Sequence, residues 1–192
     1  MHVRVAFAAL ALAVFPAVAL GPHASPSVAE ASVSRLLSLD ELVAGATHVV
    51  VATPMERKAV WEEIGGSKRI VTYTRIDVAR TVLGSAHGSV WVRTLGGAVG
   101  NVGQSVAGEA KLTIGQQAVI FLFDAAGVTV VSGRAQGHFP VGADNTLRSS
   151  PDVGGLIPQR GPAAVSARDA LIGADLEVAL GRVTQARADH AR

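Results

Sequence analysis

The sequence has 192 residues, of which 49% are hydrophobic and 17% are charged, and its formal net charge is +2. This composition excludes an intrinsically disordered chain, and the length suits one domain of ordinary size. The sequence contains no cysteine, which excludes a disulfide scaffold, a thiolate zinc site and a thiol nucleophile.

Residues 1–31 have the pattern of a secretory signal peptide followed by a leader. A short basic start at 1–4 precedes an apolar run at 5–20, and small residues follow within 17–19 and 29–31. As a helix the apolar run would measure roughly 24 Å, which is shorter than a hydrocarbon core of about 30 Å. We expect cleavage between residues 19 and 31, export to the periplasm or the extracellular space, and no membrane span in the mature chain.

Strands dominate the pattern that follows. A capping box of Ser38 with Glu41 predicts a short helix over 39–45. The β-branched residues at 48–52 predict a strand, and the alternation of side chains along 69–82 predicts a longer one. Further strands are expected at 90–94, 117–123, 127–132 and 137–141, the last paired with 145–148 across a turn. Because segment 117–123 is apolar on both faces, we expect both to be covered.

Two later segments predict connections between elements. The first, 96–108, is punctuated by Gly96, Gly97, Gly100, Gly103 and Gly108 and predicts a bulged or mobile connection. It lacks the Lys-Ser/Thr pair and the G-x-G-x-x-G pattern, so we do not expect a phosphate-binding loop. The second, 151–165, contains Pro151, Pro158 and Pro162 and predicts a loop.

The C-terminal residues predict one helix over 166–188, opened by Ser166 and Asp169. Its apolar stripe would consist of Ile172, Leu176, Leu180 and Val183. Helices are thus expected only at the two ends of the strand-rich region, which argues against βαβ units.

We therefore expect a mainly β fold, a small antiparallel β-barrel or sandwich with a short N-terminal helix and a C-terminal helix. The expected organisation is a signal peptide and leader at 1–31, a β-barrel domain at 32–150, a Pro/Gly loop at 151–165, and a helical region at 166–192 packed on or beside the barrel.

The order of motifs between residues 39 and 141 resembles a family of uncharacterised exported bacterial β-barrel proteins. The motifs that carry the resemblance are VVVATP, IVTYTRIDVARTVLGS, WVRTLGGAVGNVGQSVAG, IGQQAVIFLF and AQGHFPV. The resemblance implies an export signal and a β-barrel domain, and it implies no activity. The layout is also similar to the OB-fold of netrin-type modules and tissue inhibitors of metalloproteinases. That OB-like similarity concerns the fold alone, because those inhibitors bind the protease metal through an N-terminal cysteine that this chain lacks.

These features favour an exported, soluble, non-catalytic module that binds a protein partner or a small ligand through its loops. One version is an inhibitor or accessory protein of an exported enzyme. The expected contact residues are Trp61, in a polar turn, and four residues of the glycine-rich segment: Gly97, Gly100, Asn101 and Gly103. We expect no cofactor and no metal. Nucleic acid is not an expected partner, because the arginines of the strands accompany a near-neutral net charge and an export signal.

The alternative is a secreted hydrolase. Its site would be assembled from Ser105, Asp124 and His138, or from a bound metal. No G-x-S-x-G motif is present, and the histidines beyond the signal peptide lack the spacing of metal ligands. The non-catalytic interpretation is therefore the favoured one.

Overall fold

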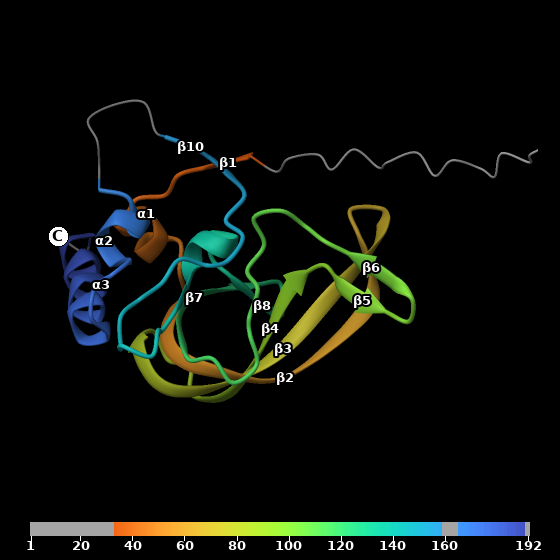
Figure 1. Ribbon diagram of the computed structural model, residues 1–192, viewed down its shortest axis with the longest axis horizontal. Coiled ribbons are helices and arrows are strands. Elements are labelled where there is room, and N and C mark those ends of the chain that lie inside the picture. The colour runs from red at the N-terminus through yellow and green to blue at the C-terminus, as the bar shows by residue number, and fades with distance from the viewer. Residues whose placement is uncertain (1–32, 159–164, 191–192) are drawn as a thin grey trace, which may run out of the picture. The chain divides into compact units, whose positions relative to one another are not determined.

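The computed structural model describes residues 33–158 and 165–190, which belong to one unit, Ala31–Arg192 (Figure 1). The predicted signal peptide and leader lie outside the described residues. Strands account for 49% of the structure and helices for 20%, so the mainly β expectation is confirmed. No helix within the described ranges is both long enough and apolar enough to cross a bilayer.

A closed five-stranded barrel forms the centre of this unit. Its strands are β2 (His48–Ile64), β3 (Ser67–Leu83), β4 (Gly88–Leu95), β8 (Val128–Val131) and β7 (Ala118–Ala125), hydrogen-bonded in that order, with β7 pairing again with β2. All neighbours are antiparallel except β4 and β8, which are parallel. The barrel is therefore antiparallel except at this pair. After β4 the chain passes through residues 96–117 to β7 before β8 returns beside β4, so a hairpin turn does not set their relative direction.

Apolar side chains from all five strands fill the barrel. The buried residues are Val50, Ala52, Ile76, Val92, Ala118, Ile120, Leu122 and Val131, together with Ala110 and Leu112 from the connection between β4 and β7. Removing each larger side chain from water contributes about 1.5–3 kcal/mol. This apolar interior holds the strands in the register that also positions the polar residues described below.

A second core lies between the barrel wall and the helices. Helix α1 (Leu39–Ala44) has the predicted capping box, with both the Ser38 and the Glu41 side chains making their hydrogen bonds. Its Leu42 and Val43 pack with Val119 and Phe121 of β7 and with residues of the C-terminal helices. Segment 118–122 is therefore buried on both faces, as the sequence predicts. In Figure 1 the three helices gather on one side of the barrel.

The C-terminal region contains two helices rather than the single one expected. Helix α2 (Ala167–Leu171) ends at Ile172, and α3 (Leu176–His190) follows after a break at Gly173, where φ is +79°. The break is held in place because Gly173 and Ala174 exchange backbone hydrogen bonds with Leu147. Ile172 thus does not belong to the stripe of α3, whose buried residues are Leu176, Ala179, Leu180, Val183 and Ala186.

Strand β2 is much longer than the predicted segment 48–52. Those residues pair with β7 on one side and β3 on the other, whereas residues beyond them pair with β3 alone. The hairpin closes at Gly65 and Gly66, whose φ values of +59° and +74° suit a type I′ turn. We call residues 57–74 the β2–β3 arm.

Two segments expected to be free of regular structure contain short strands. Residues 96–108 include the hairpin of β5 (Gly97–Val99) and β6 (Val102–Gln104). Residues 151–165 include β10 (Gly155–Ile157), which pairs in parallel with β1 (Val33–Arg35). The predicted strand at 137–141 is preceded by the 3-10 helix η1 (Arg134–Gly137), and it forms β9 (His138–Pro140), paired with β7. The β5–β6 and β1–β10 pairings were not predicted because strands of three residues are too short to show an alternating pattern.

Candidate functional site

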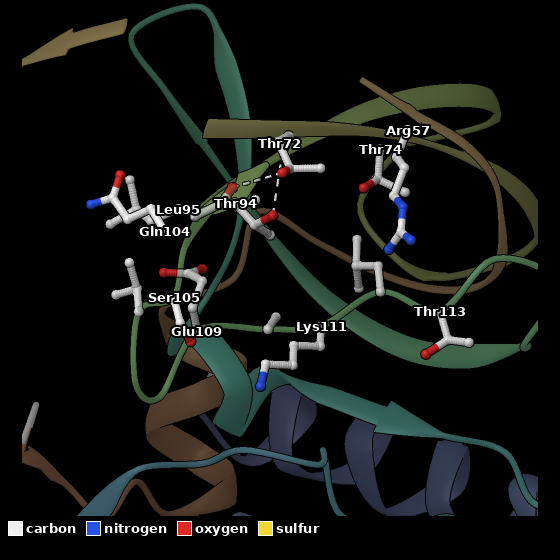
Figure 2. A pocket seen from close by; sticks show the side chains of 15 residues that line it. Arg57, Thr72, Thr74, Thr94, Leu95, Gln104, Ser105, Glu109, Lys111 and Thr113 are labelled. Carbon is white, nitrogen blue, oxygen red and sulfur yellow. Dashed lines mark hydrogen bonds between the residues drawn. The ribbon is translucent and has the colours of Figure 1, made fainter. Parts of the chain in front are cut away.

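A pocket of about 380 Å³ opens at one end of the barrel interior (Figure 2). One wall is the inner face of β3 and β4, and the opposite wall is the chain from Gln104 to Thr113. Arg57 of β2 and Gly97 of β5 complete its edge. The mouth of a β-barrel is a common place for a small-molecule site.

Threonines replace the apolar core residues where the inner wall reaches the pocket. Thr72 and Thr94 lie opposite each other on β3 and β4, and Thr74 lies opposite Val92. The Thr72 hydroxyl donates to the Gly96 carbonyl oxygen at 2.7 Å, and the Thr94 hydroxyl donates to the Thr72 carbonyl oxygen at 3.4 Å. Two of the three hydroxyls are therefore used in holding the strand end together.

The third hydroxyl, that of Thr74, is available to the pocket. Thr74 is only 2% exposed, and no hydrogen bond joins its side chain to another described residue. Among the described residues, every buried side-chain nitrogen or oxygen that is sealed from solvent has a hydrogen-bond partner. The Thr74 oxygen is consequently not sealed, and the space that reaches it is the pocket it lines.

Arg57 lies beside Thr74 on the inner face of the arm, as its partner in the β2–β3 register. Its side chain is exposed, and within the described part of the chain it has neither an ion pair nor a hydrogen bond. Figure 2 shows its guanidinium group at the pocket edge next to Thr74. Directly opposite side chains in an antiparallel pair have Cβ atoms about 4.5–5.5 Å apart, so both groups can reach one small ligand.

The acidic group of the pocket has a structural role. The buried Glu109 carboxylate accepts a hydrogen bond from Arg134 Nε at 3.1 Å. Burial raises the pKa of the Glu109 carboxyl, and the Arg134 guanidinium together with the nearby backbone amides of Ala110 and Leu95 acts in the opposite direction. This ion pair ties the connection 96–117 to η1.

Lys111 is also paired, since its Nζ lies 3.1 Å from the Asp152 carboxylate. Three charged residues line the pocket, namely Arg57, Glu109 and Lys111. Because Glu109 and Lys111 each have a counter-ion, Arg57 is the lining charge that no described residue neutralises.

Of the five predicted contact residues, one lines this pocket and the other four lie outside its lining. Gly97 lines it, and Gly103 belongs to the same β5–β6 hairpin, whose turn contains Gly100 and Asn101. Trp61 is 39% exposed and follows Arg57 and Ala59 on the inner face of the arm, with Lys68 Nζ 5.4 Å from its ring centroid. The hairpin packs against the arm. The two surfaces expected from the sequence are therefore neighbours.

The residues of the alternative hydrolase have other partners. The buried His138 bonds through Nδ1 to the Ser150 hydroxyl at 3.1 Å, and Asp124 lies 3.1 Å from His48 Nε2. Ser105 lines the pocket. No contact found in the described chain joins these three side chains, and the same residues contain no group of three or more side chains placed to hold a metal ion.

The outer face of the sheet carries the arginines considered for nucleic acid. Arg75 pairs with Glu56 at 2.8 Å and with Asp77 at 2.6 Å. Arg93 lies 3.6 Å from Glu62, which also accepts a hydrogen bond from the Tyr73 hydroxyl at 2.6 Å. This bond to a carboxylate is the main reason that the pKa of Tyr73 is raised. The positive charge of Arg75 and Arg93 is locally offset.

Sequence reasoning missed Arg57 and Thr74. The signal was present in part, because Thr72 and Thr74 share a face with Ile76 in the predicted strand. What could not be found was that this face points into the barrel and that residues 104–113 stand opposite it. In the comparisons with known proteins, no family model matches this chain and no curated protein is significantly similar to it.

Proposed function

We propose that the protein is an exported, non-catalytic binding module that holds a small ligand in the pocket at the barrel end. The β2–β3 arm and the β5–β6 hairpin would form the rim of that site. Export rests on the pattern of residues 1–31, and the resemblance to exported β-barrel proteins remains a prediction that accompanies it.

The observation that carries the proposal is the Thr74 hydroxyl, nearly buried, unpartnered among the described residues and open to the pocket. Because the pocket gives this hydroxyl its access to solvent, a ligand there could replace water as its hydrogen-bond partner, a net gain of about 0.5–1.5 kcal/mol for a typical bond. The volume of about 380 Å³ is in the range of small-molecule sites.

A non-catalytic role is favoured over the hydrolase because a nucleophile needs its base within hydrogen-bond reach. His138 instead bonds to Ser150, and burial lowers the pKa of His138 to about 4. A histidine in this state would be a weak base, and no described contact connects it to Ser105.

The test is to block the pocket entrance. Ser105 is exposed at the rim, so Ser105→Trp should obstruct the pocket without changing the core. A panel of sugars, amino acids, carboxylates and phosphates would be screened by thermal shift and calorimetry against residues 31–192. We expect at least one compound to bind the wild-type protein, to lose binding in Ser105→Trp, and to retain it in Ser67→Trp, a matched change at an exposed position of the arm tip.

Two results would contradict the proposal. The first is that no compound binds, or that every binder is indifferent to Ser105→Trp. The second is hydrolysis of an ester, peptide or glycoside by the purified protein that is abolished by both Ser105→Ala and His138→Ala, which would establish the alternative function.

A further inference from the structure

We infer that the pocket binds an oxyanion, the carboxylate or phosphate group of a small molecule, between the Arg57 guanidinium and the Thr74 hydroxyl. This inference rests on the proposed function and specifies the chemistry of its ligand.

The first support is the side chain of Arg57. Its guanidinium group has no counter-ion within the described residues, whereas the two other charged residues that line the pocket, Glu109 and Lys111, each have one. A guanidinium group presents several N–H donors in a planar fork that matches the two oxygens of a carboxylate or phosphate. A neutral ligand would leave this charge without a partner.

The second support is that Thr74 adds a donor on the same side. Thr74 is 2% exposed as a residue, and its hydroxyl oxygen is not sealed from the pocket that Thr74 lines. A hydroxyl can donate to an oxyanion that also accepts from the guanidinium group. The register pair Arg57–Thr74 thus supplies two convergent donors from two different strands.

The third support is the distribution of charge across the pocket. Figure 2 places Arg57 and Thr74 on one side, and Ser105 with Glu109 on the other. The Glu109 carboxylate would repel an anion beside it, and its ion pair with Arg134 weakens this repulsion without removing it. The anionic group is therefore expected at the Arg57 side, with the neutral remainder of the ligand toward Gln104 and Ser105.

The experiment measures binding of inorganic phosphate and of acetate to residues 31–192, by calorimetry and by amide chemical shifts, at an ionic strength held constant with sodium chloride. We expect saturable binding of at least one of them, with the largest shifts at Arg57, Thr74 and their strand neighbours. Loss of a hydrogen bond to a charged group corresponds to roughly tenfold weaker binding or more. Arg57→Gln and Thr74→Val should each show a loss of about that size.

The matched control is Arg69→Gln, which removes the same charge from an exposed position of the arm outside the pocket lining. Its affinity should equal that of the wild type. Thr74→Val nearly preserves the shape of the side chain, and because the hydroxyl it removes has no described partner, the melting temperature should not fall. That result separates loss of binding from loss of folding.

Binding of phosphate alone identifies a phosphorylated ligand, binding of acetate alone identifies a carboxylate ligand, and either supports the inference when Arg57→Gln and Thr74→Val weaken it. Absence of binding by both probes, unchanged affinity in both variants, or an equal loss in Arg69→Gln overturns it. If neutral compounds bind and are blocked by Ser105→Trp while both anions fail, the proposed function stands and the oxyanion inference is wrong.

Discussion

His138 illustrates how burial determines the chemistry of a single side chain. It is 2% exposed at the start of β9, where it bonds to the Ser150 hydroxyl, and desolvation lowers its pKa from 6.5 to about 4. The imidazole is therefore neutral in the folded protein at neutral pH. An unfolded chain would protonate the same group at its ordinary pKa.

This difference predicts a pH-dependent stability. Between pH 6.5 and pH 4 the unfolded state binds a proton that the folded state does not, so the free energy of unfolding falls as the pH is lowered through this window. The expected contribution of His138 is a loss of about 2 kcal/mol between pH 7 and pH 5. Urea unfolding at the two pH values should show a smaller loss for His138→Gln than for the wild type. The control is His87→Gln, in which this decrease should be as large as in the wild type. The account would be contradicted if His138→Gln kept the full decrease in the free energy of unfolding, or if His87→Gln made the decrease as small as His138→Gln does.

At this scale the sequence was informative where a residue acts through its immediate neighbours. The hydrogen bonds of Ser38 with Glu41 span three positions, so the sequence alone predicts them. The pairing of Arg57 with Thr74 spans the β2–β3 hairpin, and their relation to residues 104–113 depends on the closed barrel. A local sequence pattern around Arg57 or Thr74 cannot show that residues 104–113, which are distant in sequence, form the opposite wall of the pocket.

Among the elements, the β5–β6 hairpin depends on a glycine where it touches the arm. Gly97 has a φ of +130°, and a Cβ at this position would clash with the Thr72 hydroxyl oxygen and crowd Ala59. The hairpin is also fixed by the Gln104 side chain, whose amide oxygen accepts from the Ile70 amide at 2.7 Å. The glycine therefore permits the close approach that forms one edge of the pocket.

Replacing this glycine should separate the hairpin from the arm. We expect Gly97→Ala to lower the free energy of unfolding by about 1–3 kcal/mol, because both the backbone conformation and the contact are unfavourable for alanine. Gly100→Ala is the control, since its φ is +61° but no atom lies within 4 Å of the added Cβ. Urea unfolding should rank Gly97→Ala as the more destabilised variant. An equal loss in the two would show that the contact with Thr72 is unimportant.

Element lengths were predicted least well where exposure changes along an element. The alternation in β3 was visible because one face is buried, but β2 beyond residue 54 carries mostly exposed side chains and shows no such pattern. For the C-terminal region, the spacing of Ile172, Leu176 and Leu180 suits a continuous helix, although Gly173 lies between the first two. The helix is interrupted because Gly173 and Ala174 form backbone hydrogen bonds with Leu147, which is distant in sequence.

For the whole molecule, the barrel and the C-terminal helices share one hydrophobic core. Leu180 of α3 is 6% exposed and belongs to the cluster that contains Val119 and Phe121 of β7. The stability of the barrel should therefore depend on α3, although α3 is not part of the barrel wall.

The prediction compares two positions of the same helix. Leu180→Ala should lower the free energy of unfolding of the whole unit by about 2–5 kcal/mol in a single transition, since it removes buried methyl groups from the shared core. Val178→Ala, at a side chain that is 50% exposed, should change it by no more than about 0.5 kcal/mol. Circular dichroism and tryptophan fluorescence should report the same midpoint. A separate early transition of the helix in Leu180→Ala would show that the helices and barrel fold independently.

At the same scale, fold class followed from the sequence, whereas the direction of one strand pair did not. A run of strands with helices only at its two ends predicts a barrel or sandwich, and the structure contains a closed barrel. Only two residue pairs, Val92–Thr129 and Arg93–Val130, join β4 to β8. Two residue pairs between segments that are separated by residues 96–127 produce no recognisable pattern in the sequence.

The inner wall of the barrel changes from hydroxyl-bearing to purely hydrocarbon side chains between Thr74 and Ile76. For the proposed ligand, this boundary would limit how far a polar group can enter. Beyond Thr74 the wall has no side-chain oxygen or nitrogen that could replace the water lost from such a group. The pocket would then select ligands by the distance between their charged group and their apolar part. That distance would have to match the spacing of residues along β3.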